Sequence, residues 1–145
     1  MPGPIDLPDV NVWLALAVAD HAHHQRARSY WYEEAGERLA FCRVTSLGFL
    51  RLATNTTVMG GKPLTVPQAW QAYGAFRRLP EVLLAGEPEG CEAWLERWAL
   101  GERPAHRHWT DAYLASFARA GGLRLVSFDG DFIRYDDLNL LRLKV

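Results

Sequence analysis

The sequence predicts an α/β fold: a three-layer α/β/α sandwich around a mainly parallel central sheet. Short apolar runs of strand length alternate along the chain with longer segments that have helical spacing of apolar residues. Strands that alternate with helices form a parallel sheet covered on both faces. The 145 residues, 49% of them hydrophobic, suffice for one core, and we find no repeat or linker. We therefore expect a single domain over residues 1–145.

The N-terminal segment predicts a strand followed at once by a helix. Residues 5–7 are the strand candidate, the pattern breaks before Asp9, and helical spacing begins at Val10. Residues 23–37 are rich in helix formers and include consecutive aromatic residues at 30–32. Adjacent helix residues point about 100° apart, so these three rings cannot all face one core. We expect at least one of them to face a partner or a second helix.

The middle of the chain predicts a strand, two helices and a loop. Residues 39–44 have the pattern of a strand, and Thr45 is a suitable N-cap for an amphipathic helix over 46–53. Residues 55–63 contain two glycines and are expected to form a loop. The segment 65–68 has capping-box spacing and opens a helix that runs to about Arg78.

The C-terminal part continues the alternation of strands and helices. The expected elements are a strand (81–84), a helix (89–100), a charged loop (101–108), a helix that begins near Asp111 and stops at Gly121 and Gly122, a buried strand that begins at Leu123, and a last strand (138–145).

Four carboxylates fall at strand ends and helix starts. Asp9 follows the first predicted strand, and Asp129 and Asp131 follow the strand that begins at Leu123. Asp111 lies near a helix start, and in open α/β sheets such groups converge outside the carboxyl ends of the strands. Carboxylates brought together repel unless a cation lies between them. The pattern therefore predicts a divalent-metal site, and hard carboxylate oxygens suit Mg²⁺ or Mn²⁺.

Each of these acids also has an ordinary structural interpretation. Asp9 can cap the following helix, and Asp111 can stabilise a first helical turn through the helix dipole. Asp131, next to Gly130, can simply shape a turn. These roles are compatible with metal binding, and the joint pattern favours a site. The remaining acids near these motifs are expected in loops or on the surface: Asp6, Asp136 and Asp137.

Three segments occur in an informative order and spacing: DVNVWLAL from Asp9, VTSLGFLRLATN from Val44, and HWTDAYLASFARAGGLRLVSFDGDF from His108. In combination they resemble the motifs of PIN-domain ribonucleases, particularly the VapC-type toxins of bacterial type II toxin–antitoxin pairs. The resemblance implies a three-layer α/β/α fold, metal-dependent cleavage of RNA phosphodiester bonds, a homodimer, and a cognate antitoxin that blocks the site. Carried over by position, it implies three catalytic metal-binding acids (Asp9, Asp111 and Asp129), a further or water-positioning acid (Asp131), and polar residues that orient them (Asn11 and Ser127).

One departure from the family pattern lies in the second motif. The family usually has another acid, commonly Glu, early in the helix after the second strand, where this chain has Thr45, Ser46 and Leu47. Residues 38–80 contain no Asp or Glu, so no shift in alignment supplies one. Ser46 can hold a metal-bound water as a supporting residue but brings no charge. The departure removes one expected ligand of a second metal ion.

Charge is nearly balanced, with 16 Lys and Arg against 17 Asp and Glu. The balance gives no global electrostatic footprint for nonspecific nucleic-acid binding. Basic residues just before Asp111 can still contact RNA phosphate at the rim of the site, although an ordinary charged loop is an equal alternative. These RNA-binding candidates are Arg103, His106, Arg107 and His108.

Cysteine use and hydropathy indicate the compartment. Cys42 and Cys91 lie in apolar surroundings without zinc-site spacing, which predicts buried free thiols in a reducing cytosol. The chain shows no signal-peptide pattern and no apolar run of the roughly 20 residues that a membrane span needs. We expect a soluble, cytoplasmic protein without a membrane partner.

The leading hypothesis is therefore a metal-dependent endoribonuclease toxin. An alternative of another class is a noncatalytic RNA- or protein-binding module with a degenerate metal site, which the serine at position 46 motivates. A phosphatase with Asp9 as covalent nucleophile is a weaker hypothesis, because Asn11 stands where that chemistry needs a second acid.

Overall fold

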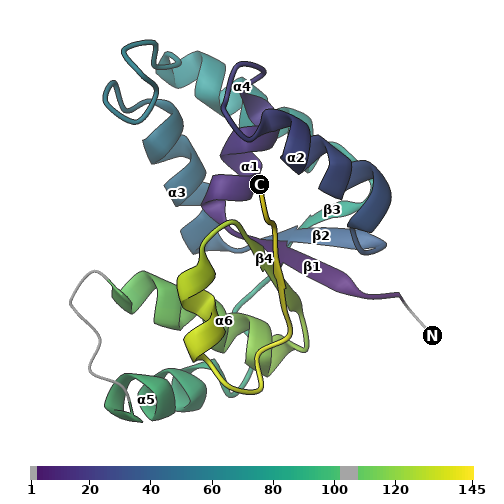
Figure 1. Cartoon of the computed structure of the whole chain (residues 1–145), viewed down its shortest axis with the longest axis vertical. Helices are drawn as coiled ribbons and strands as arrows, with labels where there is room; N and C mark the ends of the chain where they lie inside the picture. Colours follow the sequence, from purple (N-terminus) through teal and green to yellow (C-terminus); the bar gives the residue numbers. More distant parts are fainter. Residues whose placement is uncertain (1–2, 102–107) are drawn as a thin grey trace.

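A five-stranded parallel sheet forms the centre of the molecule, with the strand order β3-β2-β1-β4-β5. The computed structural model describes residues 3–101 and 108–145 (Figure 1). The strands are β1 (Ile5–Pro8), β2 (Arg38–Phe41), β3 (Val82–Leu84), β4 (Arg124–Ser127) and β5 (Leu140–Arg142). The predicted parallel α/β architecture is confirmed. The chain leaves β1 toward β2 on one side and reaches β4 on the other, so the strand order reverses between β1 and β4.

Helices cover both faces of this sheet (Figure 1). They are α1 (Val10–Ala17), α2 (His24–Ser29), α3 (Arg43–Ala53), α4 (Val66–Arg77), α5 (Cys91–Gly101) and α6 (Trp109–Gly121), with a π-helical turn η1 (Tyr30–Glu34) and a 3₁₀ turn η3 (Gly130–Arg134). In Figure 1, α1 to α4 lie above the sheet, and α5 and α6 lie below it. Within the described residues, none of the helices combines the length and apolarity needed to span a membrane.

The alternation of side chains along the strands produces two cores. Leu7 and Leu125 are fully buried in the cluster with α5 and α6, whereas Phe41 and Val126 are fully buried in the cluster with α1, α3 and α4. Successive strand residues point to opposite faces, so a strand covered on both sides is apolar throughout. The three-layer sandwich follows from this pattern.

The start of α3 differs from the prediction. The strand ends at Phe41, and Cys42 rather than Thr45 is the N-cap. Thr45 is the third residue of the helix, and its hydroxyl oxygen accepts a hydrogen bond from the Cys42 backbone N–H at 3.0 Å, as the distal residue of a capping box does. The sequence prediction was wrong by one helical turn because Thr serves in either position.

The three consecutive aromatic residues divide between core and surface, as predicted. Tyr30 is fully buried and Trp31 half-buried, while 73% of Tyr32 is exposed. The helix that contains Asp111 ends as predicted, because Gly122 takes the left-handed conformation with φ of 66° and caps α6. Cys42 and Cys91 are buried free thiols, as predicted.

Asp6 was expected in a loop or on the surface, and this prediction was wrong. The residue lies within β1 and is fully buried. Its carboxylate forms an ion pair with Arg124 at 2.9 Å and accepts hydrogen bonds from the Tyr30 hydroxyl and the Gly36 backbone N–H. A buried charge needs such partners, and here they join β1, β4 and the segment after α2.

Candidate active site

Asp9 is fixed at the carboxyl edge of the sheet, where β1 ends. Its side chain caps α1, because Oδ1 accepts the Val10 backbone N–H at 2.8 Å. Its own backbone N–H donates to the Val126 carbonyl on the neighbouring strand at 2.8 Å. The predicted capping role is confirmed, and the second carboxylate oxygen, Oδ2, faces Ser127 of β4.

Ser127 joins the acids that follow β1 and β4. Its buried hydroxyl donates to Asp9 Oδ2 at 2.8 Å and accepts from the Asp129 backbone N–H at 3.0 Å and from Asn11 Nδ2 at 3.2 Å. Asn11 Oδ1 in turn accepts the Phe128 backbone N–H at 3.4 Å. A hydroxyl has one donor and two acceptor sites, and all are used. The structure thus brings two of the three predicted supporting residues, Asn11 and Ser127, together with two predicted acids.

Replacing Ser127 with alanine is expected to loosen this network. Asp9, Asn11 and the Asp129 N–H each lose a buried partner, which costs about 1–3 kcal/mol of folding free energy. The Ser127 hydrogen bond also lowers the pKa of Asp9, so the variant should raise that pKa further. Urea unfolding and NMR titration of the Asp9 carboxyl measure both effects.

Ser116→Ala is the matched control for the serine variant. Ser116 is equally buried, but its hydroxyl donates only to the Ala112 carbonyl within α6. This variant should leave the pKa of Asp9 unchanged. An equal pKa change in both variants would contradict a specific role for Ser127.

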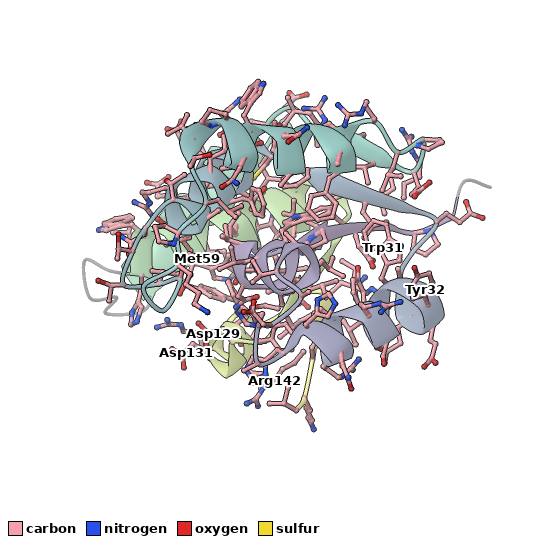
Figure 2. The ribbon with its side chains drawn as sticks, turned by 90° about the horizontal axis from the view of Figure 1, so that it is seen from above. Trp31, Tyr32, Met59, Asp129, Asp131 and Arg142 are labelled. Carbon is pink, nitrogen blue, oxygen red and sulfur yellow. The ribbon has the colours of Figure 1, made fainter. Side chains whose placement is uncertain are left out.

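Asp129 and Asp131 lie at the start of η3, directly after β4. Asp129 is the N-cap, and its Oδ1 accepts the Asp131 backbone N–H at 2.8 Å. Asp129 is half-buried and Asp131 is exposed. Figure 2 shows both acids on one side of the molecule near Arg142. A Cβ atom at Gly130 would lie 2.7 Å from Cζ of Arg142, so this glycine lets the guanidinium pack against the turn between the two acids.

Asp111 reaches the same edge from α6, where it is the third helical residue. Burial raises its pKa to about 6, the charges of Asp9 and Asp129 act in the same direction, and Arg134 opposes them. Burial also raises the pKa of Asp9, against the Ser127 and Val10 hydrogen bonds, and Asp129 contributes in the same direction. These mutual effects place the four predicted acids in one electrostatic unit at the β1–β4 switch point.

The donor set fits a hard divalent cation by chemical type. Carboxylate oxygens are the ligands that Mg²⁺ and Mn²⁺ prefer. Across residues 3–101 and 108–145, no three Asp, Glu, His or Cys side chains already lie close enough together to hold a metal ion. Neighbouring carboxylates repel one another, and a cation bound between them would replace that repulsion with attraction.

Ser46 does not join this network. It is fully buried in α3, where its hydroxyl donates to the Cys42 carbonyl at 3.0 Å and lies 3.0 Å from the Tyr73 hydroxyl of α4. Arg77 donates to the same Tyr73 oxygen at 2.9 Å. Within the described part of the chain, the Ser46 hydroxyl therefore serves the contact between α3 and α4. The role expected from the sequence, in which Ser46 holds a metal-bound water, stays a prediction.

The basic residues predicted at the rim are described only in part. His108 is the residue before α6, and its Nδ1 lies 3.3 Å from Nη1 of Arg134. Arg103, His106 and Arg107 lie outside the described residues. We did not identify Arg134 or Arg142 as site residues from the sequence. The position of Arg134, five residues after Asp129, could have indicated a place near the acids, because a turn after a strand can bring such a residue back toward the strand end.

Comparison with known families agrees with this arrangement. The model of the PIN domain matches residues 7–138, which span all four acids and both supporting residues, Asn11 and Ser127. The chain belongs to the PIN-domain family. The match confirms the resemblance that the three sequence motifs indicated.

Individual PIN-domain relatives place the chain among the VapC proteins. It is 44% identical over 140 residues to Ribonuclease VapC41 of Mycobacterium tuberculosis, covering 92% of this chain and 95% of that protein. It is 35% identical over 129 residues to Ribonuclease VapC38 of the same species, covering 85% and 84% of the two chains.

A solved structure supports the PIN-domain fold. The crystal structure of Mycobacterium tuberculosis VapC20, a sarcin–ricin loop cleaving toxin, superposes with a TM-score of 0.68 at 20% sequence identity. The superposition covers 93% of this chain and 97% of VapC20. At this identity the likeness supports the fold alone.

Proposed function

We propose that this PIN-domain protein is an endoribonuclease toxin that cleaves RNA phosphodiester bonds with Mg²⁺ or Mn²⁺. The observation that carries the proposal is the convergence of Asp9, Asp111 and Asp129 at the β1–β4 switch point, with Ser127 bonded to two of them. The VapC relatives, which are named ribonucleases, support the same activity.

Each residue has a separate part in the proposed reaction. Asp9, Asp111 and Asp129 would hold the metal ion, which when bound would supply Lewis-acid polarisation of the scissile phosphate and a water of lowered pKa. Ser127 orients the Asp9 carboxylate and holds the backbone N–H of Asp129, and Asn11 supports the Ser127 hydroxyl. The exposed Asp131 stands at the open side of the acids, where it can position an attacking water and accept its proton.

Cleavage of cellular RNA by the purified protein tests this function directly. Discrete products should appear with Mn²⁺ or Mg²⁺, disappear with EDTA, and fall by more than about 100-fold in Asp9→Ala. Glu34→Ala is a control, because the Glu34 carboxylate pairs with Arg26 at the surface. Undiminished cleavage by Asp9→Ala would contradict the assignment of the site.

The alternative is a noncatalytic RNA- or protein-binding module with a degenerate site. It is favoured by Ser46, which replaces the acid usual in the family and is bonded to Tyr73 in the interior. Calorimetric titration with Mn²⁺ separates the two functions. Binding that is lost in Asp9→Ala supports the nuclease, whereas no measurable binding to the wild-type protein supports the module.

We also propose a cytoplasmic location, a homodimer and a cognate antitoxin for this chain. A similar protein occurs in the VapBC-1 structure of nontypeable Haemophilus influenzae, with a TM-score of 0.67 at 16% identity over 96% of this chain and 98% of that chain. Figure 2 shows the exposed Tyr32 and its neighbour Trp31 away from Asp129 and Asp131. Growth arrest on expression, relieved by the product of an adjacent gene, and light scattering of the purified protein test the partner and the dimer.

A further inference from the structure

Arg134, the last residue of η3, carries buried hydrogen-bond donors without partners. Its Nε and Nη2 atoms are inaccessible to solvent, and within the described residues neither has a hydrogen-bond partner. Only Nη1 makes a hydrogen bond, to Nδ1 of His108 at 3.3 Å. Because arginine has no acceptor, this His108 nitrogen is the acceptor in the contact. One edge of the guanidinium is therefore held in place and the other is unsatisfied.

The unsatisfied edge has the geometry for a bidentate ligand. Nε and Nη2 present parallel N–H groups that match two oxygens of one phosphate or carboxylate. The Tyr135 ring lies 5.4 Å from Cζ of Arg134, and such a contact covers a face of the guanidinium rather than its N–H groups. Buried donors without partners are costly, and native proteins seldom retain them without a use. An anion that displaced the atoms now covering this edge would satisfy both donors.

Arg134 has no carboxylate at ion-pair distance within the described residues. The ion pairs there join Arg26 to Glu34 and Arg124 to Asp6, and Arg134 takes part in neither. A guanidinium without a carboxylate at contact distance attracts an external anion more strongly than one already paired. The charge of Arg134 thus agrees with the geometry of its unsatisfied edge.

The position of Arg134 connects it with the acids. The turn η3 begins directly after Asp129, and His108 immediately precedes α6, which contains Asp111. The Arg134 charge lowers the pKa of Asp111, against the other acids. A phosphate on this arginine would therefore lie beside the carboxylates rather than on a remote surface.

Arg119 shows that the Arg134 arrangement is not a general property of buried arginines in this chain. Arg119 packs its guanidinium over the Trp94 ring at 4.4 Å from the centroid, and among its nitrogens only Nε is buried without a partner. It projects from the last turn of α6, at the opposite end of the helix from Asp111. Arg119 therefore provides a matched control.

We propose that Arg134 binds a backbone phosphate of the RNA substrate at the edge of the acid cluster. The RNA displaces the atoms that now cover Nε and Nη2, and both groups then donate to two non-bridging oxygens of the phosphate. His108 orients the guanidinium from the far side. This inference rests on the proposed function and names the residue that recognises the substrate backbone next to the bond to be cleaved. Arg134 is a substrate-binding residue, distinct from the acids that hold the metal.

Binding of a single-stranded RNA oligonucleotide in EDTA tests the inference without cleavage. By fluorescence anisotropy, Arg134→Ala should weaken RNA binding by about 10-fold or more and reduce the slope of log Kd against log salt by about one. Arg134→Lys keeps the positive charge but lacks the two parallel N–H donors of the guanidinium, so it should recover only part of the RNA affinity. Arg119→Ala should bind RNA like the wild type. Unchanged affinity and salt slope in Arg134→Ala would overturn the proposal.

Folding and cleavage measurements separate the possible failures. The Arg134→Ala variant loses the His108 hydrogen bond and the charge that offsets the acids around Asp111, so its melting temperature should fall by at most about 3–6 °C. A lower melting temperature with unchanged RNA affinity assigns Arg134 to the fold and overturns the proposal. With Mn²⁺, the variant should raise KM by about 10-fold with a smaller change in kcat. If the wild-type protein binds RNA through Arg134 but does not cleave it, the proposed nuclease activity is refuted and the proposed role of Arg134 stands. If Arg134→Ala cleaves RNA with an unchanged KM, the proposed role of Arg134 is refuted and the proposed nuclease activity stands.

Discussion

Replacing Asp111 with asparagine is expected to reduce RNA cleavage by more than about 100-fold and, at the same time, to stabilise the metal-free protein. Loss of cleavage follows from the removal of one proposed metal ligand. The gain in stability follows from the position of Asp111, which is half-buried and faces the charges of Asp9 and Asp129. The same charge that serves the reaction opposes folding when no cation is bound.

The raised pKa of Asp111 explains why the substitution should stabilise the folded protein. Burial and the neighbouring acids raise the pKa of Asp111 from 3.8 to about 6, so the folded protein holds this proton more tightly than the unfolded chain. The resulting stabilisation is complete below about pH 4 and is lost as the pH rises through 6. The uncharged asparagine side chain of the variant undergoes no such loss. A shift of this size corresponds to about 3 kcal/mol, which solvent screening of a half-buried group reduces to about 1–2 kcal/mol.

Thermal unfolding in EDTA at about pH 4 and about pH 7.5 measures the effect. Asp111→Asn should melt about 3–6 °C above the wild type at the higher pH and close to it at the lower one. Added Mn²⁺ should raise the melting temperature of the wild type more than that of the variant. Asp136→Asn, at an exposed position, should show neither difference. An equal gain at both pH values would contradict the electrostatic origin.

Replacing Asp6 with alanine is expected to destabilise the fold by about 3–5 kcal/mol. The variant leaves the Arg124 guanidinium without its carboxylate and removes the acceptor of the Tyr30 hydroxyl and the Gly36 N–H. Burial and the Asp6 charge raise the pKa of Tyr30, which keeps this phenol protonated and donating. The melting temperature should fall by about 10 °C or more.

The ion pair between Arg26 and Glu34 is the control for the Asp6 variant. Its side chains are 26% and 38% exposed, so Glu34→Ala should cost at most about 1 kcal/mol. Because Asp6 lies outside the acid cluster, the folded fraction of Asp6→Ala should cleave RNA normally. A small loss of stability, or a specific loss of cleavage at full stability, would contradict this role.

The elements that follow local rules were predictable from the sequence. The strand-to-helix transition at Asp9, the capping box at Thr65 and Gln68, and the stop of α6 at Gly122 depend on a few neighbouring residues. Alternating strands and helices sufficed to predict the parallel sheet. Boundaries with two acceptable caps were less certain, so α3 begins earlier than expected, with Cys42 as its cap.

The order of residue types along the chain by itself determined the parallel α/β fold and the placement of Asp9 and Asp129 at strand ends, because backbone periodicity and capping act over a few residues. Only the tertiary structure decided the environment of each polar side chain. It buried Asp6 against Arg124, turned Ser46 toward Tyr73, and left one edge of Arg134 unpaired beside Asp111. Burial, charge and hydrogen-bond partners depend on segments far apart in the chain, and no local pattern in the sequence specifies which of them meet.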